Sequence, residues 1–145
     1  MGMRLCFSLL ILLVAAVPAA AQEPDPDEIP WTVTVKLTGG PNDYDREISL
    51  THLGAVTAID RKASKTVTEQ LSDDELLTMS LLARGYAPND LVDATCTNCI
   101  AYVLSIDANG RIYSVSFTER QLASSGAETL VRAMRRILTR MLVLG

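Results

Sequence analysis

Two cysteines separated by two residues are the most conspicuous candidates for chemistry in this chain of 145 residues. The stretch Cys96-Thr-Asn-Cys99 has the spacing of a thiol–disulfide active site, but such a site uses a helix N-terminus to lower the thiol pKa, and here a strand pattern follows directly. A zinc site would need two further ligands, with His52 the single histidine of the chain. The pattern favours a local disulfide between Cys96 and Cys99, and leaves a redox pair, half a metal site and free thiols as alternatives.

The single histidine offers little for catalysis. His52 could in principle activate a serine, but the sequence contains no Gly-x-Ser-x-Gly motif. A lone imidazole also excludes every site that requires two of them. We therefore predict a non-catalytic protein with no catalytic residue, no metal and no cofactor.

Arginines recur at four-residue steps near the C-terminus, at Arg132, Arg136 and Arg140, with Arg135 beside them. This stripe could bind an acidic partner or a membrane surface. Alternatively, it is the solvated face of an amphipathic helix, where the later arginines favour the negative end of the helix dipole. The second interpretation is favoured, because the polar faces of such helices are ordinarily charged.

A dense turn signal marks one further candidate for a binding site, the stretch Gly39-Gly40-Pro41-Asn42-Asp43. Glycine tolerates positive φ, and proline cannot continue a strand ladder. The stretch is either a plain hairpin end or a loop shaped for the cleft of a partner protein, since functional groups often lie on loops held by a rigid sheet. The residues alone favour neither interpretation.

The first 21 residues have the three parts of a secretory signal peptide: a short positive start, an apolar run over residues 5–17, and small residues before a cleavage point between Ala21 and Gln22. The apolar run is shorter than the roughly 20 residues of a membrane span, which disfavours a retained anchor. We therefore predict an exported protein, periplasmic or extracellular, that has no membrane segment after cleavage.

The residues after the leader form an acidic chain. Arg4 is the only charge of the leader, so the rest carries 12 of the 13 basic and all 17 acidic side chains, a net charge of −5. This balance argues against a general nucleic-acid binder. Residues 22–30 hold four acids and three prolines and are interpreted as a tether. Order is expected from Trp31 onward, which leaves residues 31–145 as a single domain.

The elements that position these candidates follow from hydrophobic periodicity. Residues 31–38 alternate strictly between apolar and polar side chains, residues 44–51 can return as a second strand, and residues 55–59 form a weaker third. Residues 61–65 are interpreted as a polar connection. Residues 86–95 contain proline, asparagine and aspartate and are interpreted as a loop.

The strongest local signal is a hairpin around Asn109-Gly110, a pair of residues that suits a type I′ turn. Counting outward from this turn predicts three apolar pairs on one face: Ile106 with Tyr113, Leu104 with Val115, and Tyr102 with Phe117. The opposite face is mixed and largely polar. A slip of one residue would destroy this segregation.

Two helices complete the domain. A capping box from Ser72 to Glu75 predicts a helix over residues 73–84 that ends at a left-handed Gly85. A second capping box, Ser125 to Glu128, precedes an apolar stripe on a helix of roughly 17 residues. We predict an α+β domain with an antiparallel sheet of about four to five strands from two hairpins, one face covered by the C-terminal amphipathic helix, plus a shorter middle helix.

The order of these motifs resembles that of the emfourin family. A first strand ends in Leu37-Thr38-Gly39-Gly40, Arg46 begins the returning strand, and a Leu71-Ser72-Asp73-Asp74-Glu75-Leu76 helix start follows. Cys96-x-x-Cys99 then runs into Tyr102, and a helix ends the chain. The resemblance covers most of residues 31–143. This chain departs from the family in its export signal, its acidic tether and extra residues between Thr51 and Val67.

Emfourins are small α+β proteins named for inhibiting protealysin, a thermolysin-like zinc metalloprotease. The resemblance implies that this chain inhibits a secreted or periplasmic zinc metalloprotease by occluding its active-site cleft. We place the contact, as a hypothesis, on the five residues Gly39, Gly40, Pro41, Asn42 and Asp43, from which an aspartate or a backbone carbonyl could approach the zinc.

Overall fold

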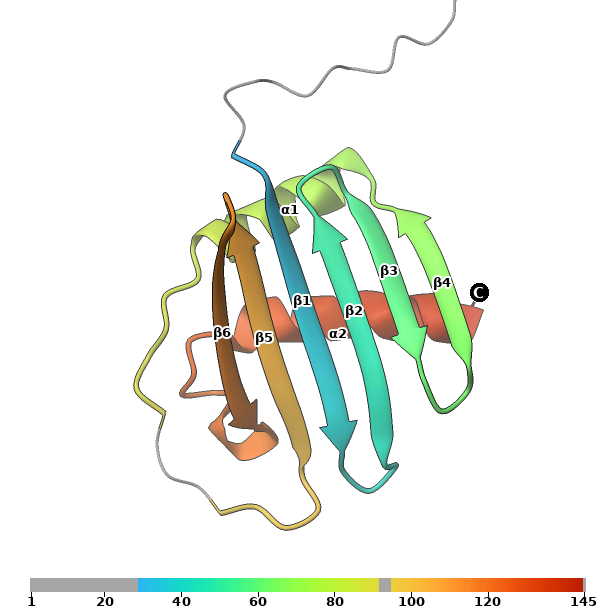
Figure 1. Cartoon of the computed structure of the whole chain (residues 1–145), viewed down its shortest axis with the longest axis vertical. Helices are drawn as coiled ribbons and strands as arrows, with labels where there is room; N and C mark the ends of the chain where they lie inside the picture. The colour runs from blue at the N-terminus through green and yellow to red at the C-terminus, as the bar shows by residue number, and fades with distance from the viewer. Residues whose placement is uncertain (1–28, 92–94, 145) are drawn as a thin grey trace, which may run out of the picture.

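The computed structural model describes residues 29–91 and 95–144 (Figure 1). The predicted signal peptide and residues 22–28 of the predicted tether lie outside these residues. The first described strand, β1, starts at Trp31. The described elements are, in chain order, β1 (Trp31–Gly39), β2 (Tyr44–Thr51), β3 (Ala55–Asp60), β4 (Lys65–Gln70), α1 (Asp73–Arg84), β5 (Ile100–Ala108), β6 (Arg111–Thr118), the 3₁₀ turn η1 (Glu119–Gln121) and α2 (Glu128–Leu144).

The fold is α+β, as expected, with one antiparallel sheet in the order β4-β3-β2-β1-β5-β6. The sheet has six strands rather than four to five, and the additional strand is β4. Its inward-facing residues include two charged side chains, which hide the apolar alternation that identifies a strand. Lys65 Nζ donates to the carbonyl of Leu142 at 2.8 Å, and Glu69 pairs with Arg140. Both charges therefore find partners on α2.

The predicted β5–β6 hairpin is confirmed residue by residue, with the three apolar pairs in the expected register. The side chains of these three pairs are not equally buried along the strands. Tyr102, Leu104 and Phe117 are buried, whereas Tyr113, nearer the turn, is 42% exposed. The ring of Tyr86, just after α1, packs against Tyr113 with centroids 6.0 Å apart. Tyr86, in the segment after α1, therefore contacts the hairpin near its turn, while residues 109–114 stay exposed.

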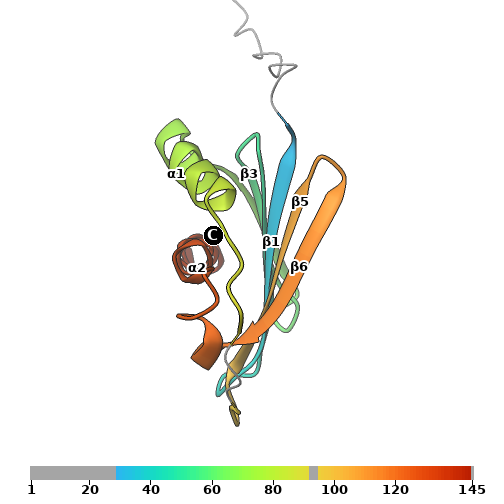
Figure 2. The same ribbon diagram turned by 90° about the vertical axis from the view of Figure 1, so that its left-hand side faces the viewer.

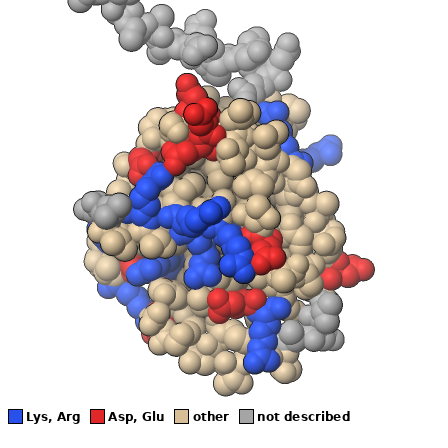
Figure 3. All heavy atoms as spheres, turned by 180° about the vertical axis from the view of Figure 1, so that it is seen from behind, with Lys and Arg blue, Asp and Glu red and all other residues tan. Residues whose placement is uncertain are grey.

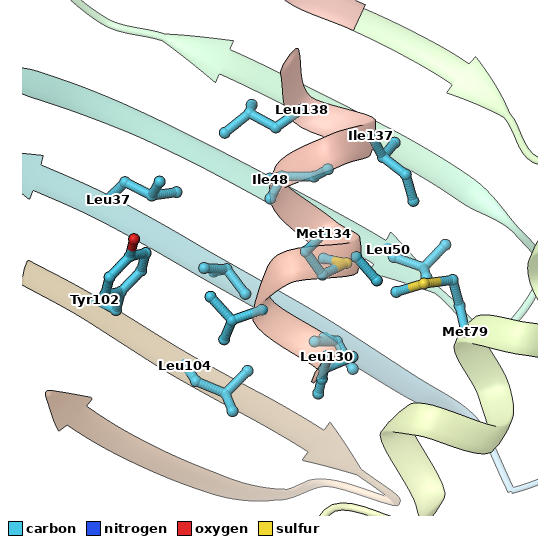
Figure 4. Packing of buried hydrophobic residues seen from close by; sticks show 14 of the residues in the cluster. Leu37, Ile48, Leu50, Met79, Tyr102, Leu104, Leu130, Met134, Ile137 and Leu138 are labelled. Carbon is cyan, nitrogen blue, oxygen red and sulfur yellow. The ribbon is translucent and has the colours of Figure 1, made fainter. Parts of the chain in front are cut away.

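The C-terminal helix covers one face of the sheet, as predicted, and α1 lies beside it on that same face (Figure 2). The stripe of α2 points into the core: Leu130, Met134 and Leu138 face the sheet residues Ile48 and Leu104 (Figure 4). Burial of such side chains supplies most of the stability of a domain this size. Met79 is the buried residue that α1 contributes to this core, and the partly buried Leu76, Leu82 and Ala83 pack against it.

The first predicted capping box is present, but the end of that helix differs from the expectation. Glu75 N–H donates to Ser72 Oγ at 3.4 Å, and Ser72 N–H donates back to the Glu75 carboxylate at 3.3 Å. Gly85 is right-handed, with φ −82°, rather than left-handed, and its N–H donates to the Leu81 carbonyl at 2.9 Å. The chain thus leaves α1 without reversing, which lets Tyr86 reach the β5–β6 hairpin.

The second predicted capping box does not form. Ser125 is buried, its hydroxyl donates to the Leu122 carbonyl at 2.7 Å, and the same oxygen accepts the Ala127 N–H at 3.0 Å. The carboxylate of Glu128 instead pairs with Arg132, one turn along the helix. Ser125 therefore stabilises the turn before α2 and not the first turn of the helix.

The other face of the sheet is mixed and largely polar, and both described helices lie on the opposite side (Figure 2). One hydroxyl from each strand stands in a single row across this face, in the order Thr68, Thr57, Ser49, Thr34, Ser105, Ser114. The last two are in contact, Oγ to Oγ, at 3.0 Å. Antiparallel sheets commonly face water on one side, and hydroxyl side chains suit that position.

Candidate functional site

The 39–43 loop joins β1 to β2 at the lower end of the sheet in Figure 1. Gly39 and Gly40 have φ of +73° and +75°, where other residues are strained, and Asp43 has φ +48°. The Asp43 N–H donates to the Gly40 carbonyl at 2.9 Å and closes the turn. Pro41 and Asn42 are exposed at the tip. The loop is therefore a compact turn that presents three side chains to solvent.

Side-chain contacts restrain the loop on the side of β2 and β3. Asn42 Nδ2 donates to Tyr44 Oη at 2.8 Å, and the Asp43 carboxylate pairs with Lys62 Nζ. The Asp43 side chain nevertheless stays 80% exposed. The Arg46 guanidinium lies 4.8 Å from the centre of the Tyr44 ring. These contacts connect the loop to Tyr44 of β2 and to the turn after β3, and they leave the Asp43 carboxylate accessible.

The two cysteines lie next to this loop. Cys96 and Cys99 have sulfurs within bonding distance and Cα atoms 5.7 Å apart, which is compatible with the expected disulfide. Gly39 is the register partner of Ile100, the first residue of β5. A Cβ on Gly39 would lie 3.4 Å from the Cys99 carbonyl oxygen, and a Cβ on Gly40 only 2.7 Å from Ile100 Cγ1. The two sites that sequence analysis selected separately are therefore in contact.

The surroundings of the cysteines differ from those of a thiol–disulfide active site. Residues 95–99 are not helical and lead directly into β5, so within the described residues neither cysteine stands at the start of a helix. Among the described residues, no three His, Cys, Asp or Glu side chains gather closely enough to hold a metal ion. Both cysteines are only partly buried.

A third component of this end, the turn between β3 and β4, was missed by sequence analysis. Asp60 is buried and accepts from the Ala63 N–H at 3.0 Å and from Arg46 Nε at 2.7 Å. The Ala63 hydrogen bond, together with Arg46, lowers the pKa of Asp60 below its ordinary value. Residues 61–65 were interpreted only as a polar connection. The signal was an aspartate at a strand end followed by two basic residues, of which Lys62 reaches Asp43.

His52 lies at the opposite end of the sheet, in the turn between β2 and β3. Its backbone N–H donates to the Trp31 carbonyl at 2.9 Å. The residue lines a hollow of about 430 Å³ with Leu53 and Asp107. His52 is thus remote from the 39–43 loop.

The arginine stripe lies on α2, and Figure 3 shows a basic patch in the middle of the face opposite to that of Figure 1. Arg132 pairs with Glu128 at 2.8 Å, and Arg140 pairs with both Glu69 and Glu75 at 2.5 Å. These internal pairs reduce the positive charge that the stripe offers to another molecule. Arg135 lies 3.8 Å from the Glu119 carboxylate, and together with Arg132 and Arg136 it lines a hollow of about 650 Å³ along α2. Arg135 also donates to Tyr102 Oη at 2.7 Å.

The pairing of Arg140 predicts a pH dependence of stability. Its hydrogen bond lowers the pKa of Glu75 below the ordinary value of 4.5. The stabilisation that Glu75 gains from its charge is therefore complete above pH 4.5 and is lost as the pH falls through the lowered folded-state pKa. We expect Glu75→Gln, which keeps a capping side chain, to lower the free energy of unfolding at pH 7 by no more than about 1 kcal/mol, because the pair is at the surface.

Urea unfolding of both proteins between pH 7 and pH 2 measures this difference. It should shrink as the pH falls below 4.5, because the Glu75 carboxyl of the unfolded chain is protonated first and the folded-state carboxylate only at lower pH. A difference that stays constant down to pH 2 would show that the Glu75 charge is not the cause. The other carboxyl with a lowered pKa, Asp60, is common to both proteins and cancels in the comparison.

Comparison with known proteins adds no relative. No protein-family model matches the chain, and no curated protein sequence matches it. Of the helices in the described part of the chain, none is long and apolar enough to cross a membrane. The resemblance to emfourins thus depends on the order of the short motifs quoted above.

Proposed function

We propose that this protein is an exported, non-catalytic binding domain that inhibits a thermolysin-like zinc metalloprotease by inserting the 39–43 loop into the active-site cleft. The observation that carries the proposal is the exposure of this loop together with the contacts that restrain it. It is exposed, closed by its own hydrogen bond, and held by Lys62 on one side and by Ile100 on the other. The resemblance to emfourins supplies the class of partner.

The mechanism is occlusion by a preorganised loop. A loop that is already ordered loses little conformational entropy on binding, so more of the contact energy appears as affinity. The zinc ion of the protease can accept an oxygen ligand from the Asp43 carboxylate or from a loop carbonyl. Asp43 would first have to leave Lys62, which costs little because exposed ion pairs contribute only about 0–1 kcal/mol.

The sheet also supports a second candidate function, that of an extracytoplasmic structural or interaction domain with another partner. The observation that favours it is the row of six hydroxyls on the face that neither described helix covers. A weaker candidate is a thiol–disulfide protein that uses Cys96 and Cys99. Insulin reduction by the purified domain tests that activity, and the strand that follows Cys99 directly argues against it.

Titration of a thermolysin-like protease with the mature domain tests the proposed function. Replacing both Asn42 and Asp43 by alanine should weaken inhibition about tenfold or more, equivalent to about 1.4 kcal/mol, because the two exposed side chains at the tip are lost. A matched control is the double variant His52→Ala with Leu53→Ala, which alters the turn at the opposite end of the sheet. This control should inhibit as the wild type does.

Three outcomes of this titration have distinct meanings. A wild-type domain that leaves the protease fully active rejects the inhibitor function. An unchanged inhibition constant for the Asn42 and Asp43 variant assigns binding to another surface. Equal weakening by both double variants would point to a loss of folding, which far-UV circular dichroism of each variant detects.

A further inference from the structure

We propose that the Cys96–Cys99 disulfide positions the 39–43 loop, so that the oxidised protein binds its partner and the reduced protein binds it weakly. This inference rests on the proposed function for the identity of the partner. Its structural basis is separate, because it concerns only how the 95–99 segment supports the loop. The 95–99 segment and the 39–43 loop are distant in sequence but lie in contact.

The first support is the closeness of the two backbones. At the end of the β1–β5 pairing Gly39 stands opposite Ile100. The Gly40 Cα approaches so closely that an added Cβ would lie 2.7 Å from Ile100 Cγ1 and 3.5 Å from Ile100 N. Ile100 is buried and directly follows Cys99. A shift of the cysteine turn would therefore move the surface on which Gly40 rests.

The second support is the conformation that both turns share. Asn98, between the cysteines, has φ +59°, and Asp43 has φ +48°. Asparagine and aspartate tolerate this left-handed region better than other non-glycine residues, and tight turns use it. A covalent bond between Cys96 and Cys99 closes the turn that contains Asn98. Without it, Asn98 can return to a favoured negative φ, and the start of β5 is released.

Other contacts limit the change to this end of the molecule. The Thr95 carbonyl accepts from Arg120 Nη1 at 3.3 Å, which keeps the segment near η1. Beyond Ile100, β5 is held by β1 and β6 along its whole length. We therefore expect reduction to loosen the 39–43 loop and to leave the sheet intact.

The redox step is an ordinary thiol–disulfide exchange. A dithiol reductant attacks one sulfur, the Cys96–Cys99 bond breaks, and a mixed disulfide forms. The second thiol of the reductant then closes its own disulfide. Two electrons and two protons pass to the protein, which gains two thiols, and the reductant is oxidised. Both cysteines are only partly buried, so a dithiol can reach them.

The test compares oxidised wild type with the double variant Cys96→Ser, Cys99→Ser, in buffer without thiol, because a free thiol would itself bind the protease zinc. The inhibition constant against a thermolysin-like protease should rise about tenfold or more. Hydrogen exchange of the Asp43 amide, which donates to the Gly40 carbonyl, should accelerate about tenfold or more, while amides of β3 keep their protection.

A destabilised control separates positioning from general stability. Val56→Ala removes buried volume in β3, away from the loop, and should lower the melting temperature without weakening inhibition. Wild type that is reduced with a dithiol, freed of it and then reoxidised should recover both its inhibition and the Asp43 protection. Loss of inhibition in the Val56 variant as well would overturn the positioning role.

The remaining outcomes distinguish the two proposals. If wild type inhibits and the serine variant inhibits equally, the disulfide does not position the loop. If oxidised wild type fails to inhibit, the proposed function is wrong, and exchange at Asp43 alone decides this inference. Faster exchange in the serine variant then supports it, and unchanged exchange rejects it.

Discussion

Gly126→Ala is expected to lower the free energy of unfolding by roughly 2–5 kcal/mol. Gly126 has φ +75°, and a Cβ there would lie 2.4 Å from the backbone oxygen of Ala87 and 3.2 Å from Asn89 Nδ2. A backbone atom cannot move aside as a flexible side chain can. The neighbouring segment is also tied down, because the Asn89 N–H donates to the Ser125 carbonyl at 3.4 Å.

Gly110→Ala is the matched control for this substitution. Gly110 has the same φ of +75°, but a Cβ there would have no neighbour within 4 Å. Only the conformational cost remains, about 1–2 kcal/mol. Urea unfolding of both variants measures the two losses, and their difference reports the contact with Ala87. Equal losses would mean that the segment after α1 is not packed against the turn before α2.

Leu104→Ala is expected to cost about 2–5 kcal/mol of unfolding free energy, the range for large-to-small changes in a core. Leu104 is fully buried in the middle of the inner face, beneath the α2 side chains (Figure 4). Removing its side chain leaves a cavity that the rigid sheet can fill only in part. Chemical denaturation of the purified domain gives the measurement.

Ile112→Ala is the control for the face assignment. Ile112 belongs to the same hairpin but points to the opposite face and is 73% exposed. Its truncation should change stability by no more than about 0.5 kcal/mol. If Ile112→Ala destabilised the domain as much as Leu104→Ala, a partner surface in solution would have to cover the outer face.

Several elements could be predicted because their signals are local. The β5–β6 register follows from Asn109-Gly110 and from alternation over the eight or nine residues of each strand. The start of α1 follows from two residues three positions apart, Ser72 and Glu75. The burial of α2 follows from an apolar stripe at helical spacing. Each of these elements depends on interactions between residues that are close in sequence or that face each other in one hairpin.

The expectations that proved wrong fail where tertiary contacts outweigh local preference. Lys65 and Glu69 face inward on β4 because α2 supplies a carbonyl and a guanidinium for them. Ser125 resembles an N-cap in sequence but is buried below the turn at Gly126, where its hydroxyl finds the Leu122 carbonyl. Such partners are distant in sequence or set by close packing, so no short pattern reveals them.

Periodicity and turn chemistry act over a few residues, so they were enough to predict the β5–β6 hairpin, the extent of both helices and the turn at residues 39–43. The contact between this turn and the cysteines became visible only in the folded domain. That contact exists because β1 and β5 are neighbours in the sheet, although β2, β3, β4 and α1 lie between them in the sequence. Pairing between strands that are distant in sequence depends on the packing of the whole sheet.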